Sequence, residues 1–233
     1  MQKVFCNNTL SKILEIACFN LESALIAQNS GADRIELCTN YTMGGLTPSH
    51  TNILDAQKQI QIPVHVIIRP HAQGFVYSDS EIAKMKNDIL FCKENKIDGI
   101  VFGILTSEYE IDINICKELI SLAKPMSLTF HRAIDECKNV EKSIEQLIEL
   151  GFDRVLTSGG KNNCVEGLEI LKILQTKFGS KIIIMPGGGI RSSNINEVLN
   201  NSYCNEFHSS ALLANDLIAN SLEIKFMKEI LNS

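Results

Sequence analysis

The sequence predicts an α/β fold of the (βα)8 TIM-barrel class. Short β-rich runs alternate with longer stretches of helical period, in eight units of about 27 residues. Charged side chains such as Glu15, Glu36 and Arg69 lie within otherwise apolar strands. A parallel strand covered by helices can place such charges in a wet environment only if the sheet closes around a lumen. The alternative is an open flavodoxin-like or Rossmann-like sheet, but no G-x-G-x-x-G follows the first strand.

The expected elements follow from these two periods. The strands cover residues 13–19, 34–38, 64–69, 99–105, 127–132, 154–158, 181–186 and 206–210. The helices cover residues 20–31, 48–60, 78–95, 112–124, 139–151, 163–178, 192–201 and 215–231. Ser78 followed by Glu81 has the spacing of a capping box, which predicts where the third helix begins.

A weak internal repeat supports the same number of units. GADRIEL (31–37) and GFDRVLT (151–157) lie four units apart, and VIIRP (66–70) resembles IIIMP (182–186). Half-barrel similarity of this kind favours eight units over an open sheet. With 233 residues, 45% of them apolar, and no Pro-rich or Gly/Ser-rich linker, residues 1–233 are expected to form one TIM-barrel domain.

Composition argues against several classes of partner. The net charge is −5 and Lys and Arg are scattered, which disfavours a nucleic-acid partner. No run approaches the roughly 18 apolar residues of a membrane span. The first apolar run is broken by Asn7, Asn8, Lys12 and Glu15, so no signal peptide is expected either. We therefore expect a cytoplasmic protein with no membrane partner.

The eight cysteines are expected to be reduced thiols, because there is no C-x-x-C pair and the chain is long for a disulfide scaffold. Cys92 and Cys116 lie in helical stretches and are interpreted as small core residues, since free cysteine is among the most buried residue types.

Strand alternation predicts which side chains share the lumen. If Glu15 points inward then Ala17 does too, while Cys18 turns toward the helices. The inward positions of the other polar strands are Arg34, Glu36, Cys38, His65, Ile67, Arg69, Ser127, Thr129, His131, Glu206, His208 and Ser210. Residues at the carboxyl ends should ring the barrel mouth, where sites form in this fold. They are Cys38, Arg69, His131, Ser158 and His208.

These polar residues are expected to have different roles. Arg34 and Arg154 begin their strands beside aspartates, which is typical of the stabilising face of a barrel. Glu15 and Glu36 have two open interpretations: carboxylates paired with Arg69 to hold the barrel together, or catalytic groups.

The two histidines at strand ends carry the stronger functional prediction. His131 and His208 are available for proton transfer or metal ligation near neutral pH. They come from different strands, so the fold would bring them to one opening.

The loops after the last two strands predict an anion-binding site. Gly187, Gly188 and Gly189 follow the seventh strand, and Ser209 and Ser210 close the eighth. In barrels these loops commonly cradle phosphate with backbone N–H groups, and glycine permits the close approach. A tight turn explains three glycines equally well when the position is ignored.

Several longer motifs resemble one known family. LEIACFNLESA (14–24), GADRIELC (31–38), GGLTPS (44–49), FHRAID (130–135), RVLTSG (154–159), MPGGGI (185–190) and EFHSSA (206–211) are similar to the copper homeostasis protein CutC family. The resemblance runs through nearly every unit. It implies a cytoplasmic TIM barrel, often a homo-oligomer, associated with copper tolerance or Cu(I) binding.

The resemblance also implies a metal site. It places copper on Cys18 and Cys38, and two thiolates suit the soft Cu(I) ion. Strand alternation puts these two side chains on opposite faces, so joint ligation requires a bulge or a rotated strand end. One family segment is altered: the usual Arg-Pro-Arg-Gly-Gly-Asp-Phe reads RPHAQGF here (69–75), with His71 as a replacement polar group.

Two functions remain open from the sequence. The first is Cu(I) binding in copper homeostasis, which the resemblance implies. The second is an enzyme that performs acid/base chemistry on a small anionic or phosphorylated metabolite. In that enzyme Arg69 would clamp the anion, and His131 or His208 would move a proton with help from Glu15 or Glu36.

Overall fold

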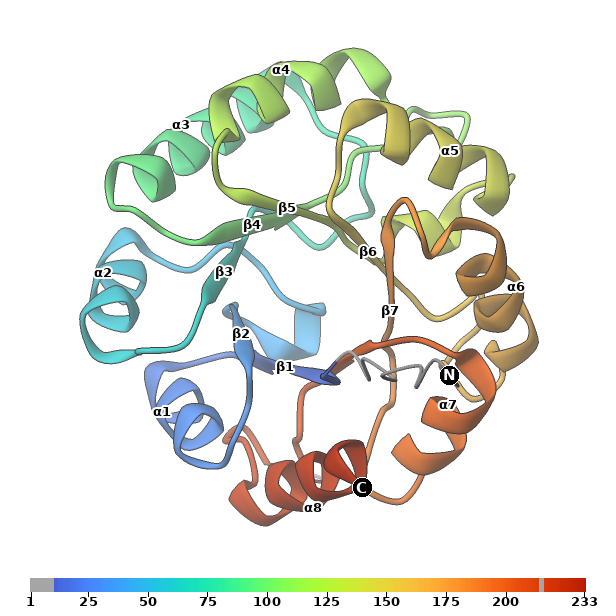
Figure 1. Ribbon diagram of the computed structural model, residues 1–233. Coiled ribbons are helices and arrows are strands. Elements are labelled where there is room, and N and C mark those ends of the chain that lie inside the picture. Colours follow the sequence, from blue (N-terminus) through green and yellow to red (C-terminus); the bar gives the residue numbers. More distant parts are fainter. Residues whose placement is uncertain (1–10, 214–215) are drawn as a thin grey trace, which may run out of the picture.

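Eight parallel strands form a barrel in the computed structural model, which describes residues 11–213 and 216–233 (Figure 1). The strands are Ile13–Cys18 (β1), Arg34–Leu37 (β2), Val64–Ile67 (β3), Gly99–Phe102 (β4), Ser127–Phe130 (β5), Arg154–Thr157 (β6), Ile183–Pro186 (β7) and Glu206–Ser209 (β8). Their hydrogen-bonded order is β7-β6-β5-β4-β3-β2-β1-β8. The (βα)8 TIM-barrel prediction is therefore confirmed.

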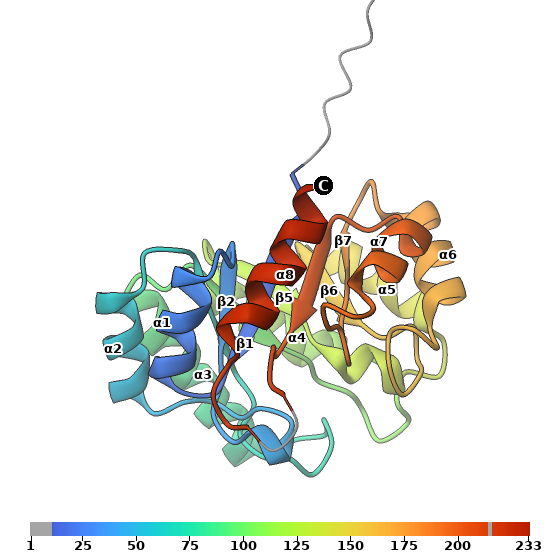
Figure 2. The ribbon, with the colours of Figure 1, turned by 90° about the horizontal axis from the view of Figure 1, so that it is seen from below.

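Among the described residues, eight α-helices surround the strands, and Figure 1 shows this arrangement from one end of the barrel. They are Leu21–Asn29 (α1), His50–Gln59 (α2), Asp79–Glu94 (α3), Ile113–Ala123 (α4), Val140–Leu150 (α5), Leu168–Phe178 (α6), Ile195–Ser202 (α7) and Ser221–Asn232 (α8). Two short 3-10 turns, Tyr41–Met43 (η1) and Arg132–Glu136 (η2), follow β2 and β5. From the side, α8 lies across the outside of β1 (Figure 2).

Local side chains explain where the helices begin. Glu81 accepts hydrogen bonds from the backbone N–H and the hydroxyl of Ser78 at 2.8 Å each, so α3 begins as predicted. The expected start of α6 at residue 163 is wrong. Asn163 Oδ1 accepts from the N–H groups of Val165 and Glu166, which forms a turn before the helix begins at Leu168.

The expected start of the last helix at residue 215 is also wrong. That residue itself lies outside the described part of the chain, but α8 begins only at Ser221. The Asn220 side chain accepts from the N–H groups of Leu222 and Glu223, both at 3.0 Å, and caps the helix there.

The main hydrophobic core lies between the strands and the helices. It contains Leu14, Ile16 and Cys18 of β1 together with apolar residues of every helix. Cys92 and Cys116 are fully buried in this core, and all seven described cysteines are buried free thiols, as expected. Cys6 lies outside the described residues. No helix in the described ranges is long and apolar enough to cross a membrane.

The β7/β8 edge is closed by side chains. Within the described residues no hydrogen-bonded ladder joins these two strands. Arg154 of β6 instead reaches Glu206 of β8, with 2.8 Å between Nε and Oε2. Nearer the carboxyl ends, the Ser209 hydroxyl donates to the Ile190 carbonyl at 2.7 Å. Polar side chains therefore complete the barrel where the backbone does not.

Candidate functional site

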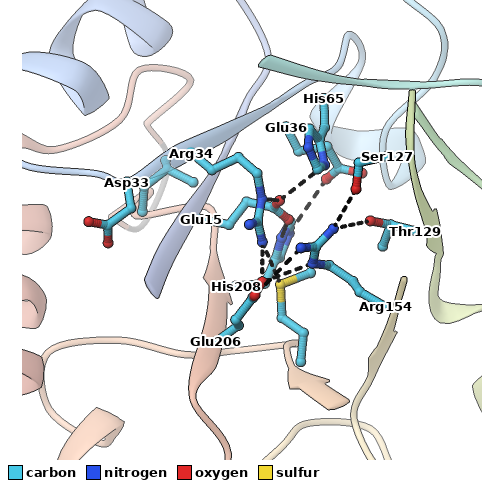
Figure 3. Close-up of polar contacts among 12 residues, drawn as sticks. Glu15, Asp33, Arg34, Glu36, His65, Ser127, Thr129, Arg154, Glu206 and His208 are labelled. Atoms are coloured by element: carbon cyan, nitrogen blue, oxygen red, sulfur yellow. Dashed lines mark hydrogen bonds and ion pairs between the residues drawn. The ribbon is translucent and has the colours of Figure 1, made fainter. Parts of the chain in front are cut away.

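The lower lumen holds four charged residues in one connected ion network (Figure 3). Arg34 lies between two carboxylates: its Nε contacts Glu15, and its Nη2 lies 2.6 Å from Glu206 Oε2. Arg154 Nε contacts the same Glu206 oxygen at 2.8 Å, and its Nη1 donates to Ser127 and Thr129. All four charges are buried and paired, which offsets their desolvation. The predicted structural role of Arg34 and Arg154 fits this arrangement.

A carboxylate–imidazole–carboxylate chain rises from that network toward the mouth. His208 Nδ1 lies 2.8 Å from Glu15 Oε1, and His208 Nε2 lies 3.5 Å from Glu36 Oε2. The register of the strands explains the contact, because Glu15 is directly opposite His208 in the β1–β8 pair. The expected pairing of Glu15 and Glu36 with Arg69 is wrong: Arg34 and His208 are their partners.

The pKa values of Glu15, His208 and Glu36 are shifted in different directions. Burial opposes ionisation of Glu15, but Arg34 and His208 outweigh it and hold the pKa of Glu15 well below its usual range. Burial alone would lower the pKa of His208, yet its hydrogen bond to Glu15 and the charges of both glutamates raise it. Burial raises the pKa of Glu36. Arg34 and His208 thus favour the anionic form of Glu15, whereas burial favours the neutral form of Glu36.

A cavity of about 360 Å³ opens at the carboxyl ends of the strands. It is lined by Ala17, Phe19, Glu36, Cys38, Tyr41, Gly44, Ile67, Arg69, Phe75, His131, Arg132, Leu156, Gly188, Gly189, Arg191, His208, Ser209 and Ser210. The structure therefore brings Glu36, Arg69, His131 and His208 to one opening. Glu15 lies beneath it, behind His208, and Gly187 is not part of the lining.

Arg69 organises one wall of the cavity. Its Nη1 donates to the carbonyls of Met43 and Gly45 at 3.0 and 3.1 Å, and its Nη2 donates to Ala72 at 3.4 Å. Thr47 accepts from the Arg69 backbone N–H at 2.8 Å. The buried Nε has no hydrogen-bond partner among the described residues. Arg69 thus holds the loop after β2 in place and keeps one donor unused.

His131 is a neutral imidazole that lines the same cavity. Its Nδ1 accepts from the backbone N–H of Ala133 at 3.2 Å, which places the ring proton on Nε2. Burial, assisted by the charge of Arg69, lowers the pKa of His131 to about 3. A Cβ at Gly103 would lie 2.6 Å from Nδ1, so glycine there admits the ring. Nε2 is buried without a partner in the described ranges.

The anion-binding loops predicted from the sequence meet at the cavity rim. Gly188 and Gly189 have φ values of +89° and +87°, a conformation that disfavours other residues. Arg191 reaches across to the β8 loop, with Nη1 3.4 Å from Ser209 Oγ and Nη2 3.3 Å from Ser210 Oγ. Glycine backbone, hydroxyl groups and a guanidinium in one place are typical of a phosphate-binding site.

Both arginines at this rim, Arg191 and Arg132, were missed by the sequence analysis. A Cβ on Gly188 would lie 3.0 Å from Arg132 Nη1, so the guanidinium borders the glycine loop. Asp135 accepts from Arg132 Nε at 2.9 Å, and Ser158 Oγ accepts from Nη2 at 2.8 Å. Ser158 therefore supports Arg132 beneath the rim. The FHRAID motif contains both Arg132 and Asp135, and it was the only signal for them.

The two predicted copper ligands lie on opposite faces of the barrel wall. Cys18 packs in the core between strands and helices, whereas Cys38 packs with Ile67 and Val101 in the lumen and lines the cavity. Their backbones are neighbours, because the Cys38 N–H donates to the Cys18 carbonyl at 2.8 Å. Burial and the charge of Glu36 raise the pKa of both thiols. Neither position favours a thiolate pair shared by one ion.

Groups of three or more histidine, cysteine or acidic side chains with metal-binding geometry do not occur in the described ranges. His65 lies beside Glu15 in the lower lumen, with 3.8 Å between Nδ1 and Oε2, and burial lowers its pKa to about 4. It was expected to face inward, and it does so as a neutral ring.

Comparison with known proteins agrees with the motifs. Residues 12–213 match the model of the CutC family. A copper homeostasis protein cutC homolog of Homo sapiens is 43% identical over 204 residues, which cover 88% of this chain and 75% of the relative. A family protein CutC of Proteus mirabilis is 47% identical over 198 residues, covering 85% and 78%.

Solved structures agree as well. A crystal structure of a CutC protein from Streptococcus agalactiae superposes with a TM-score of 0.82 at 33% identity, covering 85% of this chain and 98% of that one. Phosphoribosylanthranilate isomerase from Thermotoga maritima shares the fold, with a TM-score of 0.64 at 14% identity over 95% of this chain and 98% of that one. The chain, a TIM barrel with a charged mouth, belongs to the CutC family of copper homeostasis proteins.

Proposed function

We propose that this protein is an enzyme that performs acid/base chemistry on a small phosphorylated or otherwise anionic metabolite. The observation that carries the proposal is the Glu15–His208–Glu36 chain, which ends in a cavity bordered by three arginines. A carboxylate whose pKa is raised by burial works as a base or acid closer to neutral pH. Arg191 and Arg132 line the same cavity as Glu36 and supply positive charge for the anion.

Anion binding and proton transfer are assigned to different residues of this site. The proposed anion cradle consists of Gly188, Gly189, Arg191, Ser209 and Ser210. Glu36 takes or gives the proton, and His208 receives it from Glu36 or returns it. Glu15, fixed as an anion by Arg34, holds the Nδ1–H tautomer of His208 so that Nε2 faces Glu36. A protein that only carries a metal has no evident need for this arrangement.

Profiling a metabolite mixture tests the proposal. A small-molecule extract is incubated with the protein or with Glu36→Gln, and the two mixtures are compared by mass spectrometry. We expect the unaltered protein to consume at least one anionic metabolite at a rate that falls about 100-fold or more in Glu36→Gln, as for loss of a general acid/base. Glu118→Gln, on the surface of α4, serves as the matched control. Equal profiles for all three proteins would contradict the proposal.

Cu(I) binding is a second candidate function, favoured by the names of the relatives and by the lumen-facing Cys38. It is tested by anaerobic titration with Cu(I) of the protein and of Cys18→Ser, Cys38→Ser and the double variant. If copper binds through these thiols, the double variant loses stoichiometric binding and His131→Ala retains it. Tight binding that survives in the double variant would remove this pair as the site, and loss in His131→Ala would indicate a histidine ligand.

The expected cytoplasmic location and homo-oligomeric state belong to the same proposal. An acid/base enzyme of small metabolites would act where those metabolites are, and reduced buried thiols are compatible with a reducing compartment.

A further inference from the structure

Four buried side-chain polar atoms of the described residues have no assigned hydrogen bond, and two of them are donors of cavity-lining side chains: Arg69 Nε and His131 Nε2. The Tyr77 hydroxyl, a third such atom, contacts Arg69 from outside the cavity lining. A buried donor without a partner costs free energy, so native structures rarely retain one without a reason. Here two of them belong to side chains that line the same cavity.

The ring of Phe75 packs against both side chains. The Arg69 Cζ atom lies 5.0 Å from the centre of the Phe75 ring, and the His131 ring centre lies 4.8 Å from it at an angle of 49°. Phe75 itself is only partly buried and lines the cavity. An aromatic face compensates weakly for a missing oxygen acceptor. The contact is therefore one that a ligand oxygen can replace with a gain in free energy.

We propose that Arg69 Nε–H and His131 Nε2–H together receive the oxygen of a substrate carbonyl after Phe75 swings aside, which makes the substrate a phosphorylated aldehyde or ketone. This inference rests on the proposed function, because it assigns the anion cradle to the phosphate and Glu36 with His208 to the proton. One donor is cationic and the other is a neutral imidazole, so the pair stabilises an enolate oxygen without protonating it outright.

The step balances without any added oxidant, reductant or cofactor. Glu36 removes a proton from the carbon next to the carbonyl. The electrons of the broken C–H bond form a carbon–carbon double bond, and the carbonyl π electrons move to the oxygen, which is held by the two N–H donors. Where the α-carbon carries a hydroxyl group, the hydroxyl proton moves to the enolate oxygen, the new carbonyl forms at the α-carbon, and return of the first proton to the former carbonyl carbon gives the isomer. Return of that proton to the α-carbon instead gives exchange with solvent.

Binding of two matched probes tests the inference. 2-Phosphoglycolate carries a phosphate and a carboxylate and resembles the enolate in shape and charge, whereas ethyl phosphate carries the phosphate alone. Calorimetry should show 2-phosphoglycolate binding about 10- to 100-fold more tightly than ethyl phosphate, as for charged hydrogen bonds to buried donors. In His131→Phe this advantage should disappear while ethyl phosphate binds as before. His50→Ala, outside the cavity, is the histidine control.

A second variant, at Phe75, tests the contribution of the aromatic ring that packs against the two donor side chains. Phe75→Ala leaves Arg69 and His131 in place and removes the ring, so it should bind 2-phosphoglycolate several-fold more tightly than the unaltered protein. In the double variant with His131→Phe that gain should vanish. Thermal unfolding of each variant establishes that it is folded.

The outcomes distinguish this inference from the proposed function. Equal affinity for the two probes, with both lost in Arg191→Ala, would overturn the carbonyl site and leave the anion cradle standing. Absence of binding by either probe would overturn both. Deuterium exchange at the carbon next to the carbonyl of dihydroxyacetone phosphate, abolished in Glu36→Gln, would support the proton-transfer step directly.

Discussion

The lower lumen and the mouth of this barrel contain the same kinds of residue in opposite states. Below, Glu15, Arg34, Arg154 and Glu206 form a closed network in which each charge has a partner. Above, Arg69 and His131 each retain an unused donor among the described residues, and burial raises the pKa of Glu36. Breaking one of the buried ion pairs below would leave an uncompensated charge, whereas the unpartnered donors in the cavity wall are accessible to a ligand.

The largest expected effect is a loss of stability when the ion network of the lower lumen is broken. Glu206→Gln leaves Arg34 and Arg154 facing each other without their shared carboxylate. We expect the free energy of unfolding to fall by about 3–5 kcal/mol, the usual result of removing one partner of a buried pair. Denaturation in urea measures it. Glu118→Gln, which breaks an exposed pair with Lys86, should cost no more than about 1 kcal/mol. Similar losses in both variants would contradict the comparison.

The network also predicts how stability responds to acid. Burial opposes ionisation of Glu206, but Arg154 and Arg34 lower its pKa, and Arg34 with His208 does the same for Glu15. This stabilisation is fully present above the unfolded glutamate pKa of about 4.3 and is lost as pH falls through the lower folded values. Urea midpoints from pH 7 to pH 2 should show the decline, and Glu206→Gln should flatten it. An unchanged slope in that variant would be the contrary result.

A smaller effect belongs to the rim of the mouth. Arg191→Ala removes one guanidinium from the proposed anion cradle, and its loss should weaken binding of inorganic phosphate about tenfold, in line with a charge-assisted hydrogen bond. Calorimetry measures this at constant ionic strength. Lys177→Ala removes a cation from the surface of α6 and controls for net charge. Equal weakening by both changes would indicate a diffuse charge effect instead of a site.

The smallest expected effect is an increase in stability when Glu36 is replaced by glutamine. Because burial raises the pKa of Glu36, the folded protein holds that proton more tightly than the unfolded chain does. The resulting stability is fully present below the unfolded pKa and is lost as pH rises through the folded pKa. Glu36→Gln keeps the neutral form, so at pH 8 it should be more stable than the unaltered protein by up to about 1 kcal/mol. The gain should vanish near pH 4, and a loss at pH 8 would contradict this.

Strand alternation was enough to predict which residues face the lumen, but not which of them touch. Glu15, Glu36, His131 and His208 were all placed on the correct face from their spacing alone. Their partners depend on height in the barrel, which the stagger between strands determines: Glu15 is level with Arg34 and His208, whereas Arg69 lies beyond the end of β3. Pairing with Arg69 was one of the two open interpretations because sequence gives no register between strands.

The residues that the sequence analysis missed lie off the strands. Arg132 and Asp135 belong to η2, and Phe75 belongs to the loop after β3. Neither a 3-10 turn nor a loop has a side-chain period that predicts direction. The motifs that include these residues indicated a family, but only the folded chain shows that they border the cavity. The glycine loop was found because backbone conformation itself restricts the residue type.

Within the part of the chain that the structure describes, β7 and β8 lack the backbone ladder that joins the other neighbouring strands. A phosphate bound between Gly188 and Ser210 would link the loops that follow β7 and β8 while it is bound. Ligand occupancy would then reduce local opening, and the backbone amides flanking the gap would exchange with deuterium more slowly than those on the far side of the barrel. The ligand would thereby add to the side-chain contacts that already close this edge of the barrel.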